Sequence, residues 1–172
     1  MRLFSRRERP PADVLALLPR DDRVVSWADV AAGGAVVATS RGLWWPAAEG
    51  PRLIGWQQVD KAVWRGGVLT VTEAEIVDDL LLVDHSPVAV ALSKPRDLPP
   101  TVRKRVEANV VRSELLAVGG GAARFVARRT PGRDGVTWLA RLEQGSPDTD
   151  QMRAAISARL AILRADWNDG LR

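Results

Sequence analysis

Between residues 23 and 93 the chain alternates short segments of β-branched and aromatic residues with turns built on glycine. No long helical pattern interrupts them. Their spacing predicts short strands at about 23–29, 35–40, 42–46, 52–56, 61–65, 68–73, 79–84 and 88–93. Gly33-Gly34 and Gly66-Gly67 mark two of the turns. This spacing favours an antiparallel meander in a sandwich or partly open barrel and argues against alternating strands and helices.

The segment that follows the strands has the pattern of an amphipathic helix. From Pro99 to Leu116, one side of such a helix carries Val102, Val106, Val110 and Leu115. A helix in this position would close the open end or face of the sheet. A shorter helix is predicted before the strands, at about 11–18, because Pro10-Pro11 suits a first turn.

The last third of the chain has a different organisation. Gly119-Gly-Gly121 predicts a flexible joint, and a β-hairpin with strands at about 124–129 and 136–142 follows it. A C-terminal helix is expected to begin near Ser146, which would cap it. Its regular apolar stripe consists of Met152, Ile156, Leu160, Leu163 and Trp167. This stripe must pack on the same chain, on a partner helix or on a second copy in a homodimer.

These elements predict an α+β chain, mainly antiparallel β, in three parts. Residues 1–21 are a basic arm with a short helix, 22–118 a meander of seven or eight strands closed by a helix, and 119–172 a hairpin plus C-terminal helix.

The middle part resembles pleckstrin-homology-like domains of actinobacterial proteins. The resemblance rests on three stretches of residues 22–116: Val-Val-Ala-Thr-Ser-Arg-Gly-Leu-Trp, Ile-Gly-Trp-Gln-Gln-Val and Val-Trp-Arg-Gly-Gly-Val-Leu-Thr-Val. It implies a fold more than an activity. Domains of this family that bind phosphoinositides use Lys and Arg around the first hairpin. The corresponding turn here, Val30 to Gly34, has no cation, which argues against headgroup recognition.

Composition excludes several classes of protein. The absence of cysteine removes disulfides, thiolate metal sites, iron–sulfur clusters and cysteine nucleophiles. The chain has no apolar run long enough to cross a bilayer and no apolar segment of a secretory signal near Met1, so a cytoplasmic location is expected.

Charge is unevenly distributed along the chain. Residues 21–98 carry seven basic and eleven acidic side chains, whereas residues 99–172 carry thirteen and eight. Attraction between these parts within one molecule explains the asymmetry; a basic face for nucleic acid or anionic lipid is the alternative. The candidate residues for such a face are Arg124, Arg128, Arg129, Arg133 and Arg141.

Catalytic and metal-binding patterns are weak. The one histidine, His85, follows Asp84 in the chain, but neighbouring residues cannot supply a nucleophile, a base and an orienting group by themselves. A turn histidine is the simpler interpretation, and an enzyme that uses this turn is the less favoured alternative. No histidine pair has a metal-ligand spacing, and Gly119-Gly-Gly121 is not followed by the helix that a phosphate loop needs, so no metal or cofactor is expected.

Tryptophans supply the remaining candidate site. Neighbours in a strand face opposite sides, so Trp44 and Trp45 cannot both enter one core. The ring outside the core would be covered by the C-terminal third of the chain or by another molecule. Because Trp and Arg are enriched at binding hot spots, an exposed ring beside Arg41 or Arg52 is a candidate partner site. We therefore expect a non-enzymatic protein-interaction or scaffold module, with an anionic-surface binder as the alternative.

Overall fold

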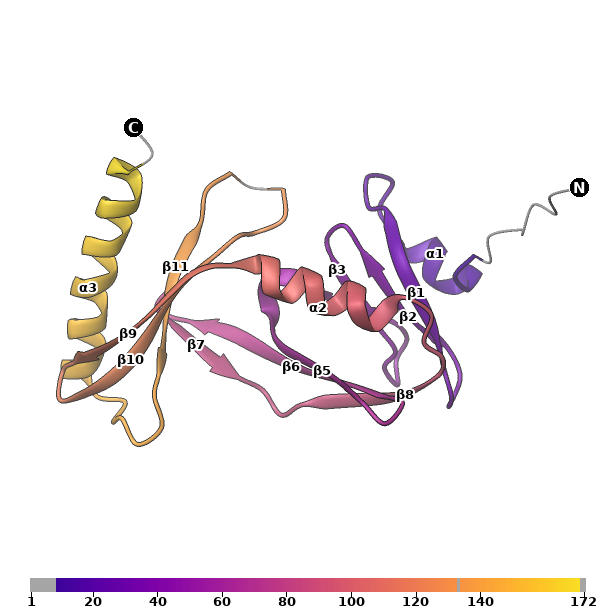
Figure 1. Cartoon of the computed structure of the whole chain (residues 1–172), viewed down its shortest axis with the longest axis horizontal. Coiled ribbons are helices and arrows are strands. Elements are labelled where there is room, and N and C mark those ends of the chain that lie inside the picture. Colours follow the sequence, from indigo (N-terminus) through magenta and orange to yellow (C-terminus); the bar gives the residue numbers. More distant parts are fainter. Residues whose placement is uncertain (1–8, 133, 171–172) are drawn as a thin grey trace, which may run out of the picture.

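Strands form most of the structure, a computed structural model that describes residues 9–132 and 134–170 (Figure 1). The strands are β1 (Val24–Val30), β2 (Ala35–Thr39), β3 (Gly42–Trp45), β4 (Arg52–Gly55), β5 (Val59–Arg65), β6 (Val68–Val77), β7 (Leu81–Asp84), β8 (Val88–Lys94), β9 (Val110–Val118), β10 (Gly121–Arg128) and β11 (Thr137–Leu142). The helices are α1 (Ala12–Leu17), α2 (Leu98–Asn109), α3 (Asp150–Asp169) and the short 3-10 helix η1 (Trp56–Gln58). The chain is thus α+β with mostly antiparallel strands and a C-terminal helix, as predicted.

The first half of the chain forms antiparallel strands, of which β1–β4 follow one another as a meander, with helix α2 packed against them. Strands β1 to β4 pair in order, β1 also pairs with β8, and β8 continues to the first half of β6, which pairs with β5. Helix α2 places Leu98 and Val102, both fully buried, against these strands. We call β1–β5, β8, α2 and the first half of β6 the N-terminal body.

The rest of the 11-stranded sheet forms the other end of the molecule. It consists of the end of β6 followed by β7, β11, β10 and β9, and all neighbours are antiparallel except β7 and β11. Helix α3 covers one face and buries the apolar stripe from Met152 to Leu163. The stripe therefore packs on the chain's own sheet, one of the alternatives predicted, and is not free for a second copy. We call these strands with α3 the C-terminal sheet.

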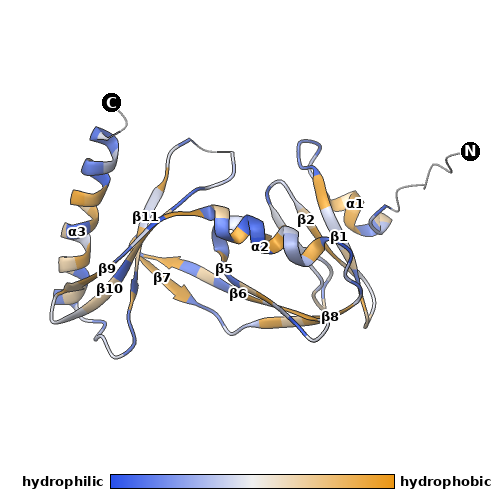
Figure 2. Cartoon of the chain, in the orientation of Figure 1, coloured by the Kyte–Doolittle hydropathy of each residue, from blue (hydrophilic) through white to orange (hydrophobic). Residues whose placement is uncertain are grey.

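Strand β6 joins the two parts because it belongs to both. Val68–Val71 pair with β8, whereas Ala74–Val77 pair with β7. Asp78 and Asp79, both at φ 53°, make the tight turn between β6 and β7. Figure 2 shows β7 as an apolar strand, in keeping with its position inside the C-terminal sheet.

The predicted helix 99–116 is wrong at its end. Helix α2 stops at Asn109, and residues from Val110 onward form β9, which pairs along β10. The apolar spacing was compatible with a helix, but the adjacent β-branched residues Val110 and Val111 favour a strand, and the pairing with β10 decides the outcome.

Gly119 and Gly120 form a tight hairpin turn between β9 and β10 rather than the predicted joint. Their φ values are 55° and 84°, which glycine adopts without strain. A Cβ at Gly119 would also lie 2.9 Å from the Cα of Met152. The boundary predicted at residues 118 and 119 therefore falls inside a hairpin that packs against α3.

Helix α3 begins later than predicted. Its cap is Thr149, whose hydroxyl accepts a hydrogen bond from the Met152 amide at 3.2 Å. Ser146 instead holds the β10 backbone, because its hydroxyl exchanges two bonds of 2.9 Å with Ala122. Within residues 9–132 and 134–170, no helix is both long and apolar enough to cross a membrane.

Candidate binding groove between β5 and α2

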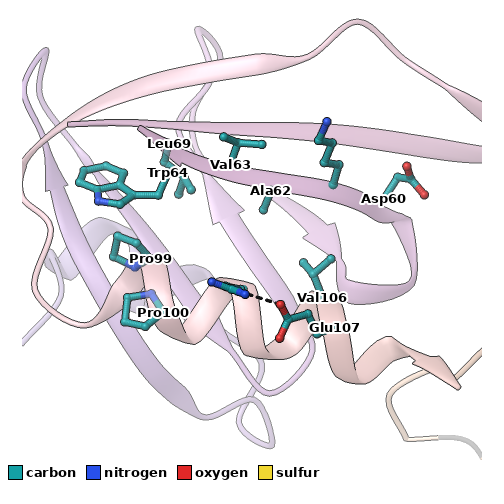
Figure 3. Close-up of a pocket in the computed structure, with 11 residues that line it drawn as sticks. Asp60, Ala62, Val63, Trp64, Leu69, Pro99, Pro100, Val106 and Glu107 are labelled. Atoms are coloured by element: carbon teal, nitrogen blue, oxygen red, sulfur yellow. Dashed lines mark hydrogen bonds and ion pairs between the residues drawn. The ribbon is translucent and has the colours of Figure 1, made fainter. Parts of the chain in front are cut away.

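Strand β5 has one open edge. It pairs with β6 on one side, and no described strand pairs with its other side. Helix α2 runs beside this open edge, so the backbone groups of β5 border a groove rather than another strand (Figure 3). An edge strand presents unpaired N–H and C=O groups to whatever occupies the neighbouring space.

The groove is lined mainly by apolar side chains and has a volume of about 550 Å³. Its β-side includes Ala62, Trp64 and Leu69; its helix side includes Pro99, Pro100 and Val106. Figure 3 shows the Trp64 ring over the two prolines at one end of the groove. The Trp64 side chain is 39% exposed, an unusual fraction for so large an apolar group.

The sequence explains how α2 forms this wall. Pro99 and Pro100 occupy the first turn of the helix, where a missing N–H costs nothing. Leu98 and Val102 turn into the core, which leaves the prolines and Val106 beside β5. Pro99 is itself buried. The wall is therefore rigid and apolar.

The charged side chains at the groove rim either form ion pairs within the chain or are basic. Arg103 donates to Glu107 at 2.7 Å across one turn of α2. Asp60 accepts from Arg128 and lies 2.7 Å from Arg141, so its charge is neutralised by the C-terminal sheet. Lys61 forms no ion pair with a described residue. The rim consequently has a net positive charge.

The tryptophans predicted as a site are not exposed together. Trp45 enters the core of the N-terminal body and is 3% exposed. Trp44 points to the opposite face and packs with Val14 of α1, Trp27 and Val37. One ring does leave the core, as alternation requires, but α1 covers it rather than the C-terminal third or another molecule.

Arg41 and Arg52 each have an acidic partner in the chain. Arg41 pairs with Asp21, and Arg52 donates to Glu73 of β6 at 2.9 Å. Neither arginine is held beside an exposed tryptophan ring, because Trp44 lies under α1.

Three of the arginines predicted as an anionic-ligand set lie close together on the β10–β11 hairpin, but each is ion-paired within the chain. Arg124 pairs with Glu143, Arg128 with Asp60, and Arg141 with Asp60 and Asp84. Arg128 is only 4% exposed. Arg129 is exposed and has no described ion pair, and Arg133 lies outside the described residues. Attraction between the acidic and basic parts of one molecule accounts for two of the five, Arg128 and Arg141, whereas Arg124 pairs within its own part.

His85 lies at the surface near Glu75, with 3.5 Å between its Nε2 and the carboxylate. It follows β7 in an exposed connection, as predicted for a turn histidine. Among the described residues there is no group of three or more His, Asp or Glu side chains that could hold a metal ion.

Sequence reasoning missed the groove itself. Trp64 was part of the tryptophan-rich stretch, but nothing in its neighbourhood marked β5 as an edge strand. The available signal was Pro99-Pro100, two rigid apolar residues at the start of an amphipathic helix that follows a strand run. Comparisons of the chain with models of protein families, with curated proteins and with solved structures find no match.

The ion pair between Arg52 and Glu73 makes stability depend on pH. The hydrogen bond from Arg52 holds the pKa of Glu73 below its ordinary value of 4.5, although burial opposes this shift. A carboxyl whose pKa is lowered by folding stabilises the folded state at pH values above its ordinary pKa. This contribution is lost as the pH falls through the lowered pKa. Glu73→Gln is therefore expected to cost about 0.5 kcal/mol at pH 7 and nothing in strong acid.

Urea unfolding from neutral to acidic pH measures this difference. Glu49→Gln, which removes an exposed acid with no described ion pair, should not change stability measurably at either pH. A loss in Glu73→Gln that stays constant with pH would show that the carboxylate contributes by packing alone.

Proposed function

We propose that the chain is a non-enzymatic intracellular protein-interaction module that binds an extended segment of another protein in the groove between β5 and α2. The observation that carries the proposal is the open edge of β5 beside an apolar groove. An extended peptide can add to such an edge as a further strand, with backbone hydrogen bonds for affinity and side-chain pockets for specificity.

The groove favours one kind of segment. Trp64, Pro99 and Pro100 offer an apolar site for one large aliphatic or aromatic side chain of the ligand. Alternate ligand residues would face away from the groove, since strand side chains alternate. Because Lys61 lacks an acidic partner at the rim, acidic residues flanking the apolar one are favoured over basic residues.

The arrangement of strands supports a pleckstrin-homology-like origin for the N-terminal body. Its meander β1–β4, the second layer β5–β6–β8 and the helix after the last strand are the features that the resemblance implies. The chain differs by the extension of β6 into β7 and the C-terminal sheet. Binding to nucleic acid or acidic lipid has less support, since Arg124, Arg128 and Arg141 are ion-paired within the chain.

Peptide selection on the full chain tests the proposed function. A random-peptide phage library yields candidate sequences, and fluorescein-labelled synthetic peptides are then titrated by anisotropy. Trp64→Ala is expected to weaken binding about tenfold or more, because truncation of a central aromatic contact commonly has this effect. Ile76→Ala is the matched control: its side chain is 46% exposed on β6 and is absent from the groove lining.

The mode of binding is tested with N-methylated peptides. Methylation of every second backbone amide removes the donors that an added strand needs. Of the two peptides that carry methyl groups on alternate sets of amides, one should therefore lose binding. Equal affinity of both methylated peptides would exclude strand addition. Equal effects of Trp64→Ala and Ile76→Ala would exclude this groove.

A further inference from the structure

Strand β9, which follows directly after α2, also has an open edge. It pairs with β10 along one side, and no described strand pairs with its other side. The strand is nine residues long and is the most solvent-exposed strand of the C-terminal sheet. Leu115 is 53% exposed and Val111 is 36% exposed, so the edge has apolar as well as backbone groups to cover.

The two charges of this edge lie on one face, two residues apart. Arg112 and Glu114 stand opposite Ala127 and Phe125 of β10, whose side chains belong to the core under α3. Arg112 lies 2.5 Å from the Glu114 carboxylate, and Arg159 of α3 lies 3.8 Å from it. Leu115 lies on the opposite face, because its β10 neighbour is Arg124.

We propose that β9 pairs antiparallel with β9 of a second copy about a twofold axis at Ser113. In this register Arg112 stands opposite the partner's Glu114, and Glu114 opposite the partner's Arg112. Val111 stands opposite the partner's Leu115 on the other face. Both charge pairs and both apolar pairs form at once, since a twofold interface is self-complementary.

The opposite signs of the two charges distinguish the β9 edge from a strand edge that is protected against pairing. Edge strands that avoid pairing carry charges of one sign, often lysine, which repel a second copy. One arginine and one glutamate at this spacing attract an antiparallel copy instead. A register shifted by two residues, with the axis at Glu114, would place the two glutamates opposite each other and is disfavoured.

The expected dimer is weak. One strand edge buries less than the roughly 1,600 Å² of a standard interface, so a dissociation constant in roughly the micromolar range is expected. The β9–β10 register shifts at Val111, so we expect the regular pairing to extend no further than this residue, which sets one end of the interface.

Sedimentation equilibrium of the full chain over a range of concentrations tests the proposal. The unchanged chain should show a monomer–dimer equilibrium. Arg112→Glu and Glu114→Arg should each weaken the dimer about tenfold or more, because each single change creates two repulsive pairs across the axis. The double variant Arg112→Glu plus Glu114→Arg should restore the dimer, which a merely destabilised fold would not do.

Arg23→Glu is the matched control, an exposed charge reversal before β1 that should leave the equilibrium unchanged. Hydrogen exchange should slow for β9 amides at high protein concentration and not for those of β5. A chain that stays monomeric at high concentration overturns the proposal. So does a dimer that survives both single variants or is not restored in the double variant.

Discussion

Replacing Asp60 with alanine is expected to destabilise the protein by about 3 kcal/mol, a large share of the stability of a domain of this size. Asp60 is the acid that Arg128 and Arg141 share. Arg128 is 4% exposed, and its other partner is the backbone carbonyl of Gln57 at 3.2 Å. Removing the carboxylate leaves a buried guanidinium without a counter-charge, and this burial, rather than the lost attraction, is the main cost.

Two further variants isolate that cause. Asp84→Ala removes a carboxylate that is 38% exposed and leaves Arg141 its contact with Asp60, so it should cost less than about 1 kcal/mol. Adding Arg128→Met to Asp60→Ala should recover part of the stability, because no buried charge is then left. Chemical denaturation measures all three. Similar losses for Asp60→Ala and Asp84→Ala would refute the account.

Removing residues 119–172 is expected to prevent cooperative folding of the remaining chain. Strand β9 would lose β10, and β7 would lose β11, its parallel neighbour. Leu81 and Leu82 are now 2% and 3% exposed. In the truncated chain they would become accessible on opposite faces of β7, whose outer edge would have no neighbouring strand. Apolar surface of this kind favours aggregation.

Near-ultraviolet circular dichroism, thermal unfolding and binding of an apolar dye measure the outcome. The truncated chain should lack a sharp transition and bind the dye strongly. In the same truncated chain, Leu81→Ser with Leu82→Ser should lower dye binding, because the exposed β7 side chains are its cause. A sharp transition at the temperature of the full chain would show that the N-terminal body folds alone.

Local sequence signals predicted the elements that depend on near neighbours. Gly33-Gly34 and Gly66-Gly67 require positive φ and mark real turns, at φ values between 57° and 104°. The stripe of α3 from Met152 to Leu163 is buried as its spacing requires. The apolar alternation around Trp44 and Trp45 correctly placed the two rings on opposite faces.

Long-range pairing could not be predicted from the same signals. The segment from Val110 to Leu116 fits a helical or an extended pattern, and β10 decides between them. A triple glycine suits a joint as well as a hairpin turn. The role of β5 as an edge strand, and hence the groove at Trp64, depends on where β8 and α2 end, which no local pattern specifies.

The parallel contact between β7 and β11 has a consequence for synthesis on the ribosome. Leu81 of β7 meets Ala140 of β11, so β7 is made well before the strand that completes its pairing. At roughly 5–20 residues per second, the interval is on the order of 3–12 s. During that time the nascent chain exposes an apolar strand edge. We therefore expect β7 to be the segment of the nascent chain that is most open to aggregation or chaperone binding before β11 emerges.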